Sequence, residues 1–264
     1  MRRLVSQARS AWAARDRTWG EPHSANGASS FHLVWEIPPA PLQEVHATLE
    51  VLVPPEVGRL YFWALQVSFI ADRRLRGSAH LGLQWHPKFP GSTAVNWGGY
   101  GSGQEGSALL RGSPSRLPSA RNDRNTRDFD WQSGRRYRLR VARAPERPSD
   151  GTHAWRGSVT DLESGIETVV RDLFTAGDAL VSPMVWSEVF ARCEQPSVTV
   201  RWSDLGAVGE GGEVYPDRVR VNYQSRADGG CDNTTVSVDE LGILQSTAVR
   251  RQVPQGALLP VPGA

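Results

Sequence analysis

The chain has 264 residues, 39% of them hydrophobic, which is enough for one sizeable core. Its 30 basic and 28 acidic residues leave a net charge of +2, so no strong field is expected to attract nucleic acid or anionic lipid. No apolar run approaches the roughly 20 residues that cross a bilayer, and no signal peptide is visible.

The first half of the chain is predicted to form strands after a short leader. Residues 1–28 drift into Gly, Pro, Ser and Asn, and we expect them to be loosely attached. Residues 30–38 and 45–53 then alternate apolar and polar side chains, as half-buried strands do. Residues 60–70 are nearly continuously apolar, which is typical of a central strand covered on both sides.

The remaining segments continue the pattern of short strands and turns. Residues 79–103 mix aromatic, histidine and glycine residues, and they fit either a turn-rich corner or the wall of a binding site. Residues 113–128 read as a long polar loop, either a functional flap or a disordered segment. Further strands are predicted at residues 135–143, 153–161, 165–173, 183–190, 196–205 and 217–223.

These elements predict an all-β protein with an antiparallel two-sheet β-sandwich of the jelly-roll type. About twelve short strands are expected, and no helical pattern separates them, so a parallel βαβ sheet is excluded. No repeat of fixed period is visible, which argues against a propeller. The expected organisation is a leader at 1–28, a sandwich domain at 29–251 and a flexible, proline-rich tail at 252–264.

The two cysteines, Cys193 and Cys231, lie 38 positions apart. One ends a predicted strand and the other sits in a turn, so a disulfide is favoured over two free thiols. A disulfide implies an oxidising compartment and therefore secretion, whereas free thiols suit the cytosol. Two isolated cysteines do not make a metal site, and neither a metal nor another cofactor is expected.

Several strand segments resemble the concanavalin A-like lectin and glucanase superfamily. The resemblance rests on "YRLRVAR…HAWRGSVTDLESGIETVVRDL", "YFWALQVSF", "AHLGLQW" and "PMVWSEVFARCEQPSVTVRW", and covers residues 30–250. The chain looks like a bacterial, mainly actinobacterial, branch of that superfamily, and the resemblance implies a concanavalin-like sandwich. The Glu-x-Asp-x-x-Glu signature of one hydrolase group is absent, as is the Arg motif with a Gln-x-His strand of the alginate lyases. The resemblance therefore implies a fold without naming an activity.

Alternation along each of these strands places a polar side chain opposite an apolar face. Gln66, Gln84, Glu188 and Arg201 each lie opposite an apolar face of their own strand, and Trp186 shares the face of Glu188. If these faces align on one concave sheet, they offer an aromatic surface beside amide, carboxylate and guanidinium groups. A sugar ring needs such a combination of stacking and directed hydrogen bonds. Carbohydrate is therefore the expected partner, with oligomeric state left open.

Further ligand-binding residues are expected at the rim of this concave polar face. The predicted ligand-binding residues are Gln66, Gln84, His86, Asn96, Trp97, Tyr100, Trp186 and Arg201. Asn96, Trp97 and Tyr100 are assigned to the rim because flexible glycines follow them. Polar residues also occur on any solvated sheet, so a structural or interaction module without a small ligand is an open alternative.

Catalysis on the same surface is the other alternative. Glu188 between Trp186 and Phe190 is the predicted proton donor, because desolvation raises a carboxyl pKa. Glu36 and Asp204 are the strand-borne candidates for the second carboxylate of a glycoside hydrolase. A polysaccharide lyase would instead combine His80 or His86 with Arg201.

Overall fold

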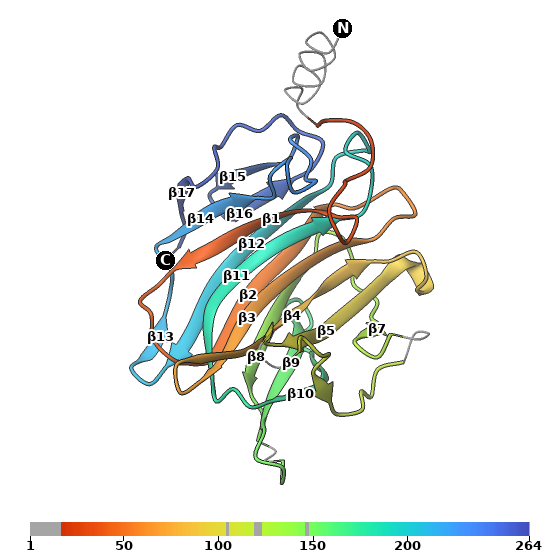
Figure 1. Ribbon diagram of the computed structural model, residues 1–264. Coiled ribbons are helices and arrows are strands. Elements are labelled where there is room, and N and C mark those ends of the chain that lie inside the picture. Colours follow the sequence, from red (N-terminus) through yellow and green to blue (C-terminus); the bar gives the residue numbers. More distant parts are fainter. Residues whose placement is uncertain (1–16, 104–105, 119–122, 146–147, 264) are drawn as a thin grey trace, which may run out of the picture.

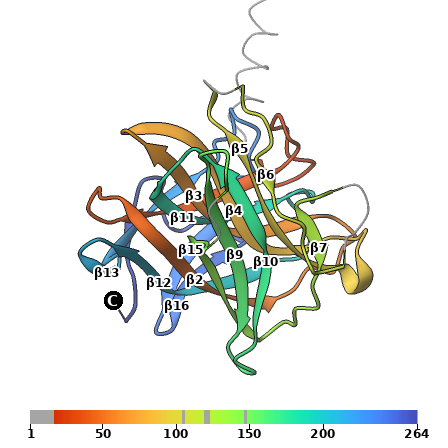
Figure 2. The same ribbon diagram turned by 90° about the horizontal axis from the view of Figure 1, so that it is seen from below.

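The computed structural model describes residues 17–103, 106–118, 123–145 and 148–263. Antiparallel strands stack in two layers, which confirms the all-β sandwich (Figures 1 and 2). Within the described residues, the helical structure is a single 3₁₀ turn at Pro90–Ser92. None of the helices found there is long and apolar enough to cross a membrane.

One layer, here called the front sheet, runs in the order β17-β14-β1-β11-β3-β4-β5-β7. Its strands are β1 (Ser29–Glu36), β3 (Tyr61–Ala71), β4 (Arg74–Trp85), β5 (Thr93–Gly101), β7 (Thr126–Asp128), β11 (Ala179–Val189), β14 (Arg218–Tyr223) and β17 (Leu258–Pro260). Figure 1 shows this series from β14 to β7 across the molecule.

The other layer, the back sheet, runs β6-β10-β9-β8-β2-β12-β16-β15, with β13 folded back on the end of β12. Its strands are β2 (Leu42–Val53), β6 (Arg111–Gly112), β8 (Arg136–Arg143), β9 (His153–Asp161), β10 (Glu167–Thr175), β12 (Thr199–Gly209), β13 (Gly212–Val214), β15 (Thr235–Asp239) and β16 (Gly242–Ser246). One backbone pairing joins strands of the two layers within the described residues, that of Leu180 in β11 with Leu42 in β2.

The core lies between the sheets and is built from the inward-facing half of each strand. The period-2 pattern puts every second residue there, as in β1, where Phe31 and Leu33 are fully buried. The front sheet contributes the buried indoles of Trp63 and Trp97, and the back sheet those of Trp155 and Trp202. The ring N–H groups of Trp97 and Trp155 donate to the carbonyls of Trp155 and Gly177, respectively.

A buried glutamine ties the two sheets together. Gln245 of β16 is 1% exposed. Its Oε1 accepts hydrogen bonds from Ser187 Oγ of β11 at 2.8 Å and Trp202 Nε1 of β12 at 2.9 Å. Its Nε2 donates to the Phe31 carbonyl of β1 at 2.8 Å. The amide is therefore satisfied on both sides, as a polar group in a core must be.

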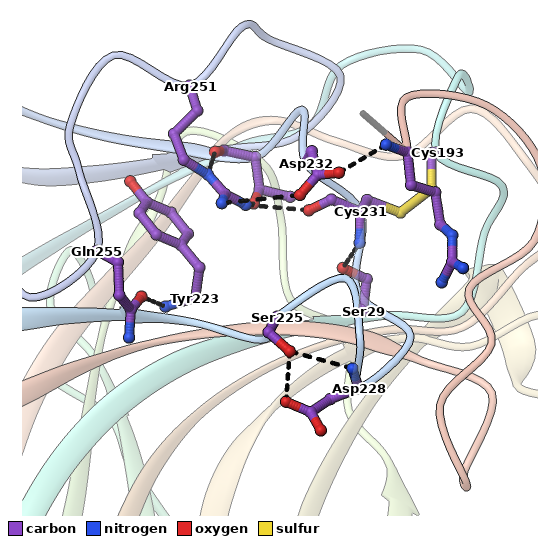
Figure 3. A network of polar contacts seen from close by, with 11 residues as sticks. Ser29, Cys193, Tyr223, Ser225, Asp228, Cys231, Asp232, Arg251 and Gln255 are labelled. Carbon is purple, nitrogen blue, oxygen red and sulfur yellow. Dashed lines mark hydrogen bonds and ion pairs between the residues drawn. A yellow bond between two sulfur atoms is a disulfide. The ribbon is translucent and has the colours of Figure 1, made fainter. Parts of the chain in front are cut away.

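The expected disulfide between Cys193 and Cys231 is formed. A polar network secures the loop that carries Cys231 (Figure 3). The Arg251 guanidinium lies 3.9 Å from the ring centre of Tyr223 and donates from Nη2 to the Cys231 carbonyl at 3.0 Å. It also donates from Nε to the Thr234 carbonyl. The disulfide and Arg251 thus fix the same loop from two sides.

The described parts of both terminal extensions make contacts with the sandwich. Residues 17–28 are attached to the disulfide region, since Arg17 N donates to Asp232 Oδ2 and the Cys193 amide donates to Gly20 O. The C-terminal tail carries β17, which pairs with β14 and extends the front sheet. Residues 1–16 and 264 of these extensions lie outside the described residues.

The predicted strands are found, with several short ones added. The β15–β16 hairpin was not expected, although "TVSVDELGILQS" alternates on both sides of a turn. Asn96, Trp97 and Tyr100, assigned to a rim beside flexible glycines, lie within a regular strand, β5. Gly99 is required there, because a Cβ atom would lie 2.3 Å from the Ser78 carbonyl of β4. The described part of the long polar loop contains β7.

Candidate functional site

The outer face of the front sheet gathers most of the predicted site residues. Strand pairing aligns Glu188 with Phe62, Phe62 with Gln84, and Gln84 with Ala94. Directly paired residues project from the same face of a sheet. The side chains gathered on the outer face are His32, Phe62, Ala64, Gln66, His80, Gln84, Asn96, Met184, Trp186 and Glu188. Two interstrand spacings separate the Cα atoms of Glu188 and Gln84, about 10 Å.

Trp186 lies among the other side chains of this face and is only 5% exposed. Its ring centre is 5.0 Å from that of Phe62 and 5.7 Å from that of His80, both in edge-on geometry. Its Nε1 donates to Gln66 Oε1 at 2.9 Å. The small residues Ala64 and Gly82, aligned with Trp186 across the sheet, leave room for the indole. The hydrogen bond between Trp186 and Gln66 therefore fixes both side chains. Because the indole is covered by its neighbours, a sugar ring cannot stack on Trp186.

Glu188 stands at the side of this aromatic group. Burial raises the pKa of its carboxyl, and a hydrogen bond from Asn26 opposes part of that rise. Asn26 Nδ2 donates to Glu188 Oε1 at 2.7 Å. Asn26 belongs to the segment that precedes β1, so the attached N-terminal segment reaches the outer face. The arrangement provides a carboxyl that holds its proton at higher pH than a solvated glutamate.

Two amide side chains on this face have terminal atoms without a partner. Gln84 is 4% exposed and Asn96 6% exposed, and the solvent-shielded atoms Gln84 Oε1 and Asn96 Oδ1 have no hydrogen bond. The Thr126 hydroxyl donates to Asp123, so it accepts from Asn96 Nδ2 at 2.8 Å. That chain of bonds orients the Asn96 amide and leaves its oxygen as the unpaired atom. Buried polar atoms without partners are uncommon in folded proteins.

Two imidazoles complete the face, and both are held neutral by burial. Desolvation lowers the pKa of His80 to about 4, against a weaker opposing effect of the Asp123 charge. Burial also lowers the pKa of His32, whose shielded Nδ1 has no hydrogen-bond partner. Neutral imidazole offers one donor and one acceptor. The centre of the face is thus polar without a fixed cation.

Two predicted ligand contacts must be corrected. Arg201 lies on β12 of the back sheet, where it forms ion pairs with Glu50 and Asp239, each at 2.7 Å. It lines a separate cavity of about 650 Å³ on that side. Trp97 is fully buried in the core, because positions 95 and 97 of β5 face inward. Neither side chain reaches the outer face of the front sheet.

Two further predictions lie at the margins of the face. His86 follows β4, and its ring centre lies 4.7 Å from that of Phe89. Tyr100 is 51% exposed on the outer face of β5. Four residues separate it from Asn96, a distance of about 13 Å along the strand.

The expected catalytic partners of Glu188 are not near it. Glu36 lies six residues from Ser30, the residue paired with Glu188, which is about 20 Å along β1. Its carboxylate accepts from Arg220 Nε at 2.9 Å. Asp204 is on the back sheet, where it accepts from Thr48 Oγ1 at 3.0 Å. The proposed lyase combination also fails, because Arg201 and His80 belong to different sheets.

Sequence reasoning missed several residues of the face. His32 and Phe62 occupy outward positions of predicted strands, so parity alone could have identified them. Asn26 and Asp123 come from segments outside the predicted strands, and no pattern points to them. Among the described residues, no three His, Cys, Asp or Glu side chains gather as metal ligands.

Comparisons with known proteins find distant structural likeness. No protein-family model matches the chain, and no curated protein matches it. It is similar to a scytalido-glutamic peptidase solved with a transition-state analogue inhibitor, at 13% identity and a TM-score of 0.44, over 87% of this chain and 98% of that one.

Two other solved structures are also similar to the chain. SCP-B, a peptidase of the eqolisin family solved with the tripeptide Ala-Ile-His, has 12% identity and a TM-score of 0.43, over 87% of this chain and 98% of that one. The PL-14 alginate lyase from Aplysia kurodai has 8% identity and a TM-score of 0.26, over 57% of this chain and 69% of that one. At these identities and TM-scores, no activity of those proteins can be transferred to this chain.

Proposed function

We propose that the outer face of the front sheet binds a glycan through Gln84, Asn96 and Glu188. The observation that supports this is the pair of deeply buried amides whose oxygen atoms lack partners on the face that also carries Glu188. A sugar hydroxyl can donate a hydrogen bond, so it can satisfy the unpaired oxygens of Gln84 and Asn96.

The charge of the face favours a neutral ligand. The outward positions of β3, β5 and β11 contain no Arg or Lys. Arg218 and Arg220 of β14 lie on the same face nearer its edge, where Arg220 Nε donates to Glu36. Both imidazoles are neutral at physiological pH because burial lowers their pKa values. At the centre of the face, around Gln84 and Asn96, a uronic acid or sulfated sugar would therefore meet no counter-charge, whereas an uncharged sugar would meet acceptors, donors and the edges of aromatic rings.

The test is a panel of neutral oligosaccharides screened on an array and followed by calorimetry. Gln84→Leu should weaken binding by about tenfold or more, since one good hydrogen bond in a shielded site is worth about 1.4 kcal/mol. Gln43→Leu is the matched control, because Gln43 lies on β2 of the back sheet. The proposal would be refuted if both variants bound equally well, or if the wild-type protein bound none of the oligosaccharides.

A hydrolase on the same face is the second candidate, supported by the raised pKa of Glu188. A carboxyl whose pKa is raised holds its proton to higher pH and can protonate a leaving group. Glu36 and Asp204 are too far away to complete a two-carboxylate glycosidase, so Glu188 would work with neutral partners. Release of reducing ends by wild type and its loss in Glu188→Gln, with binding retained, would favour this candidate. Protein substrates assayed in parallel would show whether the cleaved bond is a peptide bond instead.

The disulfide supports an oxidising compartment for the folded protein. We infer export on that ground, and mass spectrometry of protein isolated from its native host, with thiols blocked before lysis, tests it. Recovery of free Cys193 and Cys231 thiols would contradict the inference.

A further inference from the structure

The edge where the two sheets adjoin contains a buried arginine that the proposed glycan site does not use. Arg171 of β10 is 4% exposed and pairs with Gly157 of β9. Its neighbour Asp172 points the other way, toward Arg156. The Arg171 side chain is therefore on the inner side of the back sheet, beside the start of β7 in the front sheet.

The hydrogen bonding of Arg171 is one-sided. Nη1 donates to the Arg124 carbonyl at 2.7 Å. Nε and Nη2 are shielded from solvent and have no hydrogen-bond partner. These two N–H groups form the parallel fork that suits two oxygens of a carboxylate, phosphate or sulfate. A buried charge without a partner is costly, so an unmatched fork at this depth points to an anion.

The same chain shows how such a fork is satisfied elsewhere. Arg156 donates from Nε and Nη2 to the two carboxylate oxygens of Asp172, at 2.9 and 3.0 Å. Arg201 directs its Nε and Nη2 to Asp239. Both of those arginines are more exposed than Arg171 and yet are fully paired. Arg171 has the same fork in a more buried place, without a carboxylate.

The surroundings of Arg171 add positive charge. The charges of Arg127 and Arg124 join burial in lowering the pKa of Arg171 to about 10, with Asp123 opposing. Arg127 is 7% exposed and donates from Nη1 only to backbone carbonyls, those of Asp123 and Thr126. The Asp123 carboxylate is engaged by Thr126 Oγ1 and the Asn125 amide. Among the described residues, Asp123 is thus the one acid near the guanidinium groups of Arg171, Arg127 and Arg124, and its carboxylate makes no hydrogen bond to them.

We propose that Arg171, flanked by Arg127 and Arg124, binds an oxyanion with two oxygens on the Nε–Nη2 fork. The anion is either free, as sulfate or phosphate, or the acidic group of a sugar. The proposed anion contacts include none of Gln84, Asn96 and Glu188, and the proposal does not depend on the glycan proposal.

The experiment is calorimetry with sodium sulfate and with trigalacturonate in a constant background of sodium chloride, supported by thermal unfolding. Wild type should bind at least one of these probes saturably and rise in melting temperature, since a ligand that binds only the folded state stabilises it. Arg171→Lys keeps the charge but loses the fork, and should bind at least tenfold more weakly. Arg136→Met removes an exposed arginine of β8 and should bind as wild type does.

The outcomes separate the sources of the anion. Tighter binding of trigalacturonate than of sulfate assigns an acidic sugar, and the reverse assigns a free inorganic anion. Gln84→Leu should leave the affinities for sulfate and trigalacturonate unchanged. A failure of the glycan proposal can therefore be told apart from a failure of the anion site. Equal binding by Arg171→Lys and wild type, or no saturable binding of either probe by wild type, overturns the anion site.

Discussion

Replacing Gln84 with leucine should stabilise the folded protein while it weakens ligand binding. Gln84 is 4% exposed, and its Oε1 has no hydrogen-bond partner in the folded chain. A buried polar atom left unsatisfied costs about 1–3 kcal/mol, and leucine of similar volume removes that cost. Trp131 Nε1 bonds to the Gln84 backbone carbonyl at 3.0 Å, so the substitution leaves this contact in place.

The expected gain is about 1 kcal/mol, the lower end of that range, because a branched side chain will not fill the site of a glutamine perfectly. For a domain of this size, that gain corresponds to a rise in melting temperature of about 2–4 °C. Urea unfolding followed by tryptophan fluorescence and calorimetry measures both quantities without ligand.

Gln245→Leu is the matched control, because the same substitution should act with the opposite sign. It removes three hydrogen bonds and leaves Ser187 Oγ, Trp202 Nε1 and the Phe31 carbonyl buried without their partner. At about 1–3 kcal/mol for each such group, a loss of several kcal/mol is expected. If Gln84→Leu destabilises the fold as Gln245→Leu does, then Gln84 is a structural residue and the argument for a ligand at this face fails.

Three further predictions concern titration, the disulfide and the packing under Trp186. Because the pKa of Glu188 is raised in the folded state, ionisation should cost stability as pH rises above its ordinary value of 4.5. The stability advantage of Glu188→Gln should therefore be absent at lower pH and grow through that window in pH-dependent urea titrations; a constant difference would contradict the raised pKa. Cys193→Ser with Cys231→Ser should lower the free energy of unfolding by about 4 kcal/mol for a 38-residue separation, measured by urea titration beside the oxidised protein. Gly82→Ala should lower the melting temperature strongly, because the new Cβ atom would lie 2.0 Å from the Trp63 carbonyl, whereas Gly134→Ala, where nothing lies within 4 Å, tests the effect of positive φ alone. Equal losses in the two glycine variants would show that the close approach at Gly82 is unimportant.

Strand alternation in the sequence determined which side of its own strand each residue occupies. It correctly separated Trp63 and Leu65, which are buried inward, from Gln66, and it placed Gln84 and Glu188 on polar faces. The all-β class followed from the same period, because side chains on a pleated strand alternate whatever the tertiary fold. The bond between Cys193 and Cys231 was also within reach of sequence, since the chain has no other cysteine.

Only the tertiary structure decided which faces belong together. Strand alternation correctly gives Arg201 an outward side chain, but β12 belongs to the back sheet. Alternation within one strand does not reveal which sheet that strand joins. The depth of burial was equally hidden: Trp186 is covered because Phe62, His80 and Gln66 approach it from strands far apart in the sequence. Asn26 reaches Glu188 across 162 positions of chain. Local spacing fixes the direction of a side chain, whereas its neighbours, and hence its pKa and its unmet hydrogen bonds, depend on long-range strand pairing.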